Sequence, residues 1–274
     1  AFSGRQNVLQ SHLNQEQVMS ALVDRLVAHV LSLEVRLLAC QARLTARTDP
    51  EALHDLRTTV RRLRSLLRPL RGLPGVEQLE DAASAVGQLT TPWRDREVLA
   101  AYLLKHDQPE AAQRRMAQMA EAYPALAASA EVASLLMILD AFPRFLRASQ
   151  RQGLLKGLDK RIEKRLGKQW QKLDEALHDP AHDRHRLRLL IKRVRYGIEA
   201  YPQLDRLPKP AYKQLKSAQG ALGDWHDCWQ WLARAEQEAD LQPCVATWQA
   251  GLIKAELKAD RVLEKLSATC FKHS

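Results

Sequence analysis

Five basic side chains recur at helical spacing between residues 54 and 68, and their chemistry is that of anion binding. Like charges three or four residues apart each cost about 0.2–0.5 kcal/mol in an isolated helix, and no nearby run of acids offsets that cost here. At about 100° per residue, all five fall within about 80° of arc on one side of a helix. This basic stripe, which indicates a polyanion lying along it, consists of His54, Arg57, Arg61, Arg64 and Arg68.

The same pattern occurs a second time in the other half of the chain, where it begins at His185. From position 54 to position 64, residue types match at each equivalent basic position except one, where Arg61 is replaced by Lys192. A repeat period of about half the chain indicates a duplicated half-domain rather than a solenoid. The candidate binding residues of the second copy are His185, Arg188, Lys192, Arg193 and Arg195.

The positive charge of the chain is concentrated on these two segments. The formal net charge of the whole chain is +10 at pH 7, whereas residues 51–71 and residues 182–199 each carry a net charge of +4. Both segments use mainly arginine, whose planar guanidinium group suits phosphate oxygens. The alternative interpretation is a solvated or salt-bridged face, but the duplication and the concentration of charge favour anion binding.

Some basic residues near the stripes are weaker candidates. Arg62 belongs to the candidate binding set of the first copy, but Arg62 and Arg193 lie about 80–100° away from their stripes, toward another wall of the site or toward acidic partners. Arg68 has no basic counterpart, because Glu199 stands at the equivalent position. The weakest candidates are Lys213 and Lys216.

His54 and His185 occupy the first turns of their predicted helices, where free N–H groups and the helix dipole favour an anion. General acid or base catalysis, metal ligation, phosphate ligation and a structural role are all compatible with a histidine there. No nucleophile or paired carboxylate stands at the same spacing, so phosphate ligation or ordering of the site is favoured over catalysis.

Two other groups of residues suggest chemistry that we expect to be absent. His178, Asp179, His182, Asp183 and His185 resemble a metal-binding cluster, but a proline interrupts the helical spacing and no cysteine joins them, so no metal site is predicted. The second group consists of Trp225, Trp229 and Trp231, which would stack bases in a nucleic-acid-binding protein, although core packing is the simpler interpretation.

Composition predicts an all-α protein. The chain of 274 residues is 46% hydrophobic, contains only 11 glycines and shows no alternating strand pattern. Its four cysteines have no short spacing, and there is no signal peptide pattern. No apolar run is long enough for a membrane-spanning helix, which needs about 18 residues or more. We therefore expect a reduced protein of the cytoplasm with no membrane span.

The predicted elements follow the duplication. Asp49 and Pro50 are expected to start the first basic helix, and Asp179 and Pro180 the second. Asp95 and Asp227 are expected at matched helix starts, where each caps a helix or orients a neighbouring basic group. The other expected helices cover residues 16–47, 76–89, a segment from the kinked junction at 91–95 to 105, 109–122, 131–150, 154–177, 209–221, 225–240 and 245–268, with residues 1–15 as a polar tail or linker.

These motifs resemble the CHAD domain, a helical family with conserved histidines. The first copy reads His54-x-x-Arg57-x-x-x-Arg61-Arg62-Leu63-Arg64, followed by Arg94-Asp95, and the second copy repeats it from His185 to Tyr196, followed by Leu222-Gly223 and Asp227. The resemblance covers about residues 16–270, with halves at about 16–150 and 151–270. The first half departs from the pattern at Leu89-Thr90, and Glu80 stands where the second half has Lys216.

The resemblance implies a duplicated helical bundle, in which two four-helix-bundle halves with pseudo-twofold symmetry surround a basic central groove. It also implies non-catalytic binding of inorganic polyphosphate, association with polyphosphate granules, and frequent fusion to a CYTH triphosphate-tunnel domain, whose ExExK signature this sequence lacks. No cofactor is expected. The alternatives are an RNA-binding module and, third, a phosphohydrolase or triphosphatase that uses His54 and His185.

Overall fold

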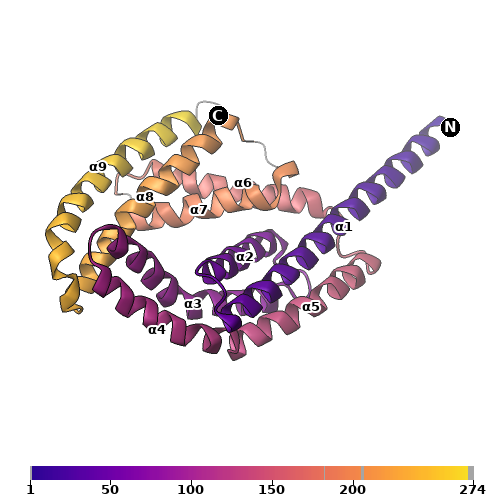
Figure 1. Cartoon of the computed structure of the whole chain (residues 1–274). Helices are drawn as coiled ribbons and strands as arrows, with labels where there is room; N and C mark the ends of the chain where they lie inside the picture. The colour runs from indigo at the N-terminus through magenta and orange to yellow at the C-terminus, as the bar shows by residue number, and fades with distance from the viewer. Residues whose placement is uncertain (1, 182, 205–206, 271–274) are drawn as a thin grey trace. The chain divides into compact units, whose positions relative to one another are not determined.

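The computed structural model describes residues 2–181, 183–204 and 207–270, and this part of the chain contains helices joined by short connections and no strands (Figure 1). The predicted all-α class is therefore confirmed. The α-helices of the described residues are α1 (Phe2–Ala46), α2 (Ala52–Leu67), α3 (Val76–Lys105), α4 (Pro109–Ala127), α5 (Ala130–Arg151), α6 (Leu158–Leu177), α7 (Arg184–Ala200), α8 (Lys209–Ala235) and α9 (Val245–Cys270), with short 3-10 helices η1 (Arg68–Leu70), η2 (Pro202–Leu204) and η3 (Ala239–Cys244).

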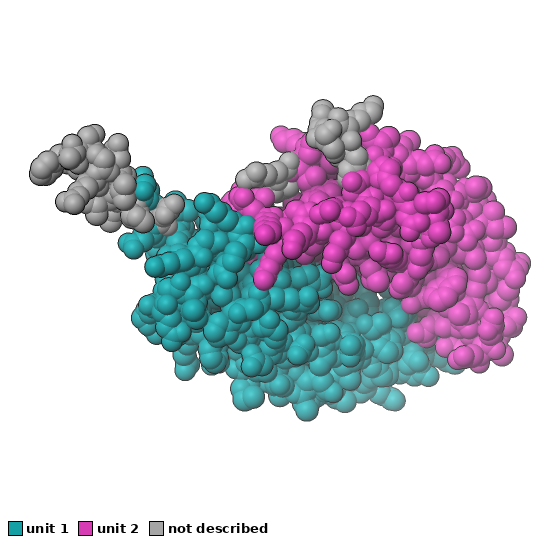
Figure 2. All heavy atoms as spheres, turned by 180° about the vertical axis from the view of Figure 1, so that it is seen from behind, with its two compact units in different colours: residues 1–98, 114–162 teal, residues 99–113, 163–274 magenta. Residues whose placement is uncertain are grey.

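The chain divides into two compact units, which we describe separately (Figure 2). Unit 1 consists of Ala1–Val98 and Arg114–Ile162, and unit 2 of Leu99–Gln113 and Glu163–Ser274. Residues 99–113, which the sequence assigns to the first half, thus belong to unit 2. Each unit contains one of the two basic helices, α2 in unit 1 and α7 in unit 2.

In unit 1 the apolar side of α2 packs against α1, and α1 also contacts α5. Leu56, Val60 and Leu63 of α2 are buried at the i, i+4, i+7 spacing that gives a helix one apolar face. Each such side chain contributes about 1.5–3 kcal/mol through its removal from water. On α1 an apolar seam at helical spacing is buried from Leu22 onward, whereas Val18 is exposed; its buried members are Leu22, Leu26, Val30, Leu33, Leu37 and Leu44.

Unit 2 has its own core, formed by the inward faces of α6, α7, α8 and α9. Buried side chains from all four helices contact one another, among them Leu173, Ile191, Leu222 and Leu263. At Gly197 of α7, a Cβ atom would come within 3.1 Å of Leu166 Cδ2 and of Gln169 Oε1. The close approach of α6 to α7 at this point therefore depends on the absence of a side chain.

The starts of the two basic helices differ from the prediction. Asp49 does not cap α2, because it stands two residues before the N-cap position; its carboxylate accepts a hydrogen bond from the backbone N–H of Glu51 at 3.1 Å and two from Arg43 at 2.8 and 2.6 Å. α2 begins after Glu51, which makes no side-chain cap. In the second copy, Asp183 rather than Asp179 caps the helix, because its carboxylate accepts a hydrogen bond from the backbone N–H of His185 at 2.8 Å.

The predicted junctions at Thr91–Asp95 and at Leu222–Asp227 are wrong, because α3 and α8 continue through both. Pro92 lies inside α3, and Gly223 inside α8. Asp95 and Asp227 therefore lie within helices and cap neither one. A helical interior tolerates one glycine at about 1 kcal/mol, and packing of a long helix outweighs that amount.

In the described part of the chain, no single helix is both long and apolar enough to cross a membrane. Helices α4 and α5 reach that length and composition only when taken together, across a bend of 42°.

Some predictions fall outside the described part of the chain. Ala1 of the predicted tail and His182 of the histidine cluster lie there, as does the side chain of Cys270, whereas residues 2–15 form the first turns of α1. The described cysteines Cys40, Cys228 and Cys244 are free thiols. The predicted groove involves both units together and stays a prediction.

Candidate functional site

Both basic stripes are half-buried in their own units. On α2 the guanidinium-bearing residues Arg57, Arg61 and Arg64 are all of intermediate exposure. On α7 the equivalent residues Arg188, Lys192 and Arg195 have the same intermediate exposure. The side chains that the sequence places off the stripe, Arg62 and Arg193, are exposed in both copies. Arg62 and Arg193 thus lie in solvent, as does His185 of the second stripe, whereas the arginine and lysine side chains of the stripes are half-buried.

Arg57 is fixed by oxygens that carry no charge. Its Nη1 donates to the backbone oxygen of Gly87 at 2.9 Å, to Thr90 Oγ1 at 2.7 Å and to Thr91 Oγ1 at 3.2 Å. All three acceptors belong to α3. Among the described residues no carboxylate accepts a hydrogen bond from Arg57, so its charge is positioned without being neutralised directly.

The electrostatic surroundings of Arg57 are mixed. Burial lowers the pKa of Arg57, Asp95 raises it and Arg94 lowers it. Arg94 is paired at 2.8 Å with the buried Glu97 through Nη1 and Oε2, and Glu97 also accepts a hydrogen bond from the hydroxyl of Tyr123. Unit 1 therefore places a second cation, supported by its own ion pair, near Arg57.

Arg64 approaches the same point on α3. A Cβ atom on Gly87 would lie 3.8 Å from Arg64 Nη1, and the Gly87 backbone oxygen is the acceptor used by Arg57. The Nε atom of Arg64 is buried and has no hydrogen-bond partner among the described residues. Two stripe residues of unit 1 thus meet at one residue of α3.

In unit 2 the basic stripe surrounds a buried histidine that the sequence analysis did not select. His226 of α8 is only 9% exposed, and its ring centroid lies 5.7 Å from that of His185. Burial lowers the pKa of His226 to about 4, and the nearby charges of Arg188, His185 and Lys192 act in the same direction. The structure therefore brings three predicted site residues of α7 together around a neutral imidazole.

Alignment of the two copies beyond the stripes would have found this histidine. Trp93-Arg94-Asp95 aligns with Trp225-His226-Asp227, so that His226 takes the place of Arg94. The repeat pairs Asp95 with Asp227, and the residues that precede these two are Arg94 and His226.

Arg195 has an acidic partner that its counterpart Arg64 does not have. Its Nη2 lies 3.2 Å from Glu199 Oε1, which also accepts a hydrogen bond from the Tyr212 hydroxyl at 3.4 Å. In the first copy Arg68 stands at the position of Glu199. The last stripe residue of unit 2 is therefore partly neutralised, and we rank Arg195 below Arg188 and Lys192 as an anion ligand.

The remaining predicted residues are more dispersed. His54 is half-buried in the first turn of α2. Arg62 lies toward α1, because its charge lowers the pKa of His29 there, after the larger effect of burial. Arg193 and Lys216 are exposed, and no described hydrogen bond or ion pair joins either to the stripe of α7.

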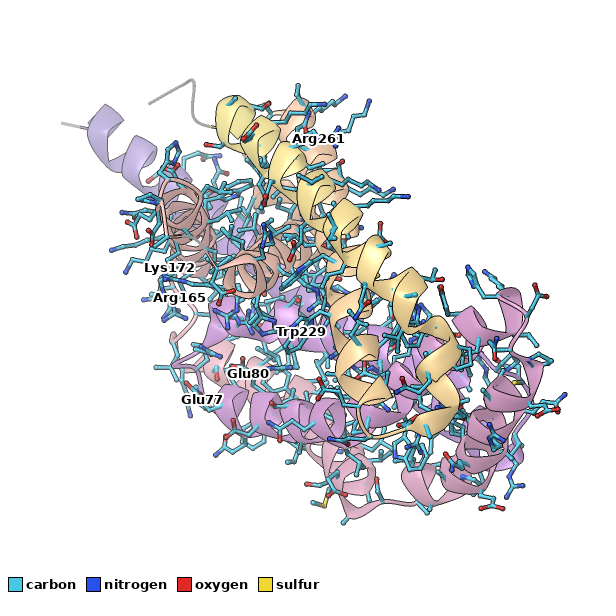
Figure 3. The ribbon with its side chains drawn as sticks, turned by 90° about the vertical axis from the view of Figure 1, so that its left-hand side faces the viewer. Glu77, Glu80, Arg165, Lys172, Trp229 and Arg261 are labelled. Atoms are coloured by element: carbon cyan, nitrogen blue, oxygen red, sulfur yellow. The ribbon has the colours of Figure 1, made fainter. Side chains whose placement is uncertain are left out.

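The departure at Glu80 has a structural explanation (Figure 3). Glu80 of α3 is 5% exposed and accepts two hydrogen bonds from Arg71, from Nε at 2.6 Å and from Nη2 at 2.5 Å. This bidentate pair joins the chain after η1 to α3. Glu80 is thus a structural residue of unit 1. In the register that pairs Trp93 with Trp225 its counterpart is Tyr212, whereas Lys216 is an exposed residue of unit 2.

The tryptophans of α8 divide between core and surface. Trp231 is buried in an aromatic cluster of unit 2 with Tyr102 and Trp248, at centroid distances of 4.5 and 5.4 Å. Trp229, labelled in Figure 3, is exposed. Its side chain is 53% exposed, and its ring lies nearly parallel to that of His226, with centroids 6.1 Å apart and an interplanar angle of 22°. Core packing therefore describes Trp231 but not Trp229.

The described residues contain no group of three or more histidine, cysteine, aspartate or glutamate side chains placed to hold a metal ion. His178 instead contacts Asp174 of α6, with Nδ1 3.0 Å from Oδ1. His182 lies outside the described residues, so the complete histidine cluster is not tested.

Comparison with known proteins gives two matches. The sequence model of a family described as "CHAD domain" matches residues 29–236. The crystal structure of the CHAD domain from the plant Ricinus communis is similar, with a TM-score of 0.64 and 22% identity over 90% of each chain, a likeness that establishes the fold. A search among curated proteins finds no match.

Proposed function

Because the chain belongs to the CHAD domain family, we propose that it binds inorganic polyphosphate without catalysing its cleavage. The binding residues are those of the two stripes with their flanking cations. In unit 1 they are His54, Arg57, Arg61, Arg62 and Arg64, and in unit 2 they are His185, Arg188, Lys192, Arg193, Arg195 and, most peripherally, Lys216.

The observation that carries this proposal is the state of Arg57. Its guanidinium is half-buried and is hydrogen-bonded to three neutral oxygens. A partly buried charge that is held by neutral groups gains from an external anion, because the anion adds a Coulomb attraction that neutral oxygens do not supply. The repetition of the stripe in unit 2 makes a ligand with many identical charges the best match.

A phosphate polymer fits this arrangement better than a nucleic acid does. From the histidine to the last matched arginine, each stripe covers about 15 Å of helix at a rise of about 1.5 Å per residue. No exposed aromatic side chain lies on α2 or α7 to stack a base, since Tyr196 of α7 is buried. We include in the proposal that one polymer engages both stripes, as expected for the family's basic groove between two helical bundles.

The test is calorimetry with long-chain polyphosphate, single-stranded RNA and duplex DNA at near-physiological salt. Polyphosphate is expected to bind at least about tenfold tighter than either nucleic acid, and log K to fall steeply with log salt as counterions are released. Equal or tighter RNA binding would replace the proposal with an RNA-binding function. Release of phosphate from polyphosphate with a divalent metal, lost in His54→Ala, would make the protein a phosphohydrolase.

Charge reversal tests whether the stripes act together. Arg61→Glu and Lys192→Glu should each weaken polyphosphate binding by more than about 1.5–3 kcal/mol, because each removes a charge-assisted contact and adds repulsion. The double variant should lose less than the sum if one chain engages both stripes. Arg144→Glu, at an exposed position of α5, makes the same change in net charge and should have little effect. Halved stoichiometry with unchanged residual affinity would indicate two independent sites instead.

We also propose that the protein associates with polyphosphate granules in the cytoplasm and acts beside a CYTH-type domain. Co-sedimentation of the protein with granules, and its loss in Arg61→Glu, would test the first part.

A further inference from the structure

The exposed ring of Trp229 lies at a position where unit 2 has an aromatic residue and unit 1 has an acidic residue. In the alignment that pairs Arg94 with His226, Trp229 pairs with Glu97. In unit 1 these positions form a buried ion pair at 2.8 Å, and in unit 2 they form a pair of nearly parallel rings. Unit 2 has thus exchanged an acid for an indole that is 53% exposed.

The imidazole of His226 lies between this indole and the cations of α7. The imidazole of His226 lies 6.1 Å from the ring of Trp229 on one side and 5.7 Å from the ring of His185 on another. The charges of Arg188 and Lys192 are also close to that imidazole, since both act on it electrostatically. An exposed aromatic surface and a group of cations therefore adjoin the same buried residue.

We propose that unit 2 binds nucleoside polyphosphates, with the base stacked on Trp229 and the phosphates on His185, Arg188 and Lys192. The inference rests on the proposed function, because it uses the same cations, and it adds a second class of ligand. A nucleotide carries a flat aromatic base and several phosphate charges within one small molecule. Its two parts match the ring and the cations that flank His226.

The surface favours one base rather than a run of bases. Proteins that bind single-stranded nucleic acids offer several aromatic rings, on which successive bases stack. In the described part of unit 2, Trp229 is the one large aromatic side chain that is exposed, while Trp231 and Trp248 are buried. Unit 1 has a charged pair at the equivalent place and offers no stacking surface there. A free nucleotide is therefore the ligand with the better fit.

The experiment measures binding of ATP and of inorganic tripolyphosphate, without added metal, to the full chain and to variants. Trp229→Ala should weaken ATP binding about tenfold, the size expected for loss of one stacked base, and should leave tripolyphosphate binding unchanged. ATP should also quench tryptophan fluorescence in the wild type, and tripolyphosphate should not. Trp229→Phe retains a ring and should keep most of the ATP affinity.

The controls distinguish a loss of base stacking from a loss of phosphate binding and from misfolding. Phe145→Ala removes an exposed aromatic side chain from unit 1 and should change neither affinity. An equal loss for ATP and tripolyphosphate in Trp229→Ala, or no loss for either, would overturn the inference. A larger loss for a short oligoadenylate than for ATP would overturn it in favour of a polynucleotide.

Failure of the inference is distinguishable from failure of polyphosphate binding. If tripolyphosphate binds and Trp229 has no effect on ATP, the inference fails and the proposed function stands. If ATP binds through Trp229 while long-chain polyphosphate does not bind, the inference stands and the proposed function fails. Absence of binding by all three ligands overturns both.

Discussion

Units 1 and 2 carry the same basic stripe but support it with different chemistry. In unit 1, α3 supplies neutral oxygens to Arg57 and a second cation, Arg94, that is held by Glu97. In unit 2, α8 supplies the buried imidazole of His226 and the exposed indole of Trp229. The duplicated feature is the set of charges on one helix, and the feature that has diverged is the neighbouring helix.

The two copies therefore differ in the kind of basic group that lies beside each stripe. The cations supporting unit 1 are arginines, which stay charged at every pH at which proteins fold. Unit 2 replaces one of them by a histidine whose pKa is lowered to about 4, so that its charge is absent at neutral pH. At neutral pH the position of unit 2 that matches Arg94 therefore carries no positive charge.

The largest loss of stability is expected for substitution of Glu80 in unit 1, and Lys216 of unit 2 provides the comparison. Glu80→Ala removes a buried carboxylate that is bonded twice to Arg71, and we expect a loss of about 3 kcal/mol in the free energy of unfolding. Lys216→Ala changes an exposed position of unit 2 and should change stability by less than about 0.5 kcal/mol. Urea unfolding of both variants measures the difference.

Equal losses of stability for these two substitutions would contradict this prediction. They would mean that the Arg71–Glu80 pair adds little to unit 1, as many partly exposed ion pairs do. Arg71 is 52% exposed in its side chain, so the carboxylate is the partner whose burial is at stake.

A second prediction concerns the pH dependence of stability. Because the pKa of His226 is lowered to about 4 from its ordinary value of 6.5, the unfolded chain binds a proton at higher pH than the folded chain does. The stability linked to this residue is full above pH 6.5 and is lost as the pH falls toward 4. We expect His226→Gln to lose about 2 kcal/mol less than the wild type between pH 7 and pH 4.5.

The measurement is urea unfolding of the wild type and of His226→Gln at both pH values. The difference between the two proteins cancels the carboxylates that titrate in the same range. Parallel stability curves for the two proteins would show that the imidazole is not held neutral by its surroundings, and the proposed contrast with Arg94 would be lost.

The smallest expected effect concerns Thr90, which connects Arg57 to α3. Its hydroxyl accepts a hydrogen bond from Arg57 at 2.7 Å and donates one to the backbone oxygen of Val86 at 2.8 Å. Thr90→Val should cost about 1 kcal/mol of stability and weaken polyphosphate binding a few-fold, because Arg57 loses one of its acceptors. Calorimetry and urea unfolding give the two quantities.

Thr59→Val is the matched control. Thr59 is also buried and donates to the backbone oxygen of Asp55 at 2.8 Å, but it accepts no described hydrogen bond from an arginine. An equal loss of polyphosphate affinity in the two variants would show that the contact with Arg57 is not what matters at Thr90.

Much of the fold was predictable because it follows from local periodicity. The apolar face of α2 and the seam of α1 from Leu22 onward are buried as their spacing predicts, and the half-buried stripes separate from the exposed Arg62 and Arg193. These features depend only on the angle between successive side chains on one helix. Periodicity therefore identifies the side of the helix that bears the site.

The helix ends were not predictable in the same way. Proline and glycine at Pro92 and Gly223 indicate breaks, yet both lie inside continuous helices whose other residues are packed on neighbours. Asp49 was expected to cap α2, but the helix begins after Glu51, and the Asp49 carboxylate accepts hydrogen bonds from the Glu51 backbone N–H and from Arg43. The contact with Arg43 of α1 is a tertiary contact that a local pattern does not reveal.

The missed residues belong to the helix opposite the stripe. His226 and Trp229 acquire their importance from α7, which lies against α8. A scan for clustered cations selects α7 and passes over them, because a neutral imidazole and an indole add nothing to the charge. The alignment of the two copies, rather than the charge, was the sequence feature that would have located His226.

The hydrogen bonds of Arg57 also determine how a ligand would be received. A long arginine side chain usually loses rotational freedom when it is captured, at about 0.5–1.5 kcal/mol for each side chain that becomes immobile. Arg57 is already immobilised through Nη1, and the hydrogen bonds of the described residues leave its Nη2 and Nε groups unused. This candidate ligand-binding side chain is thus pre-organised, so that much of the entropic penalty of ordering it is met during folding and not during association.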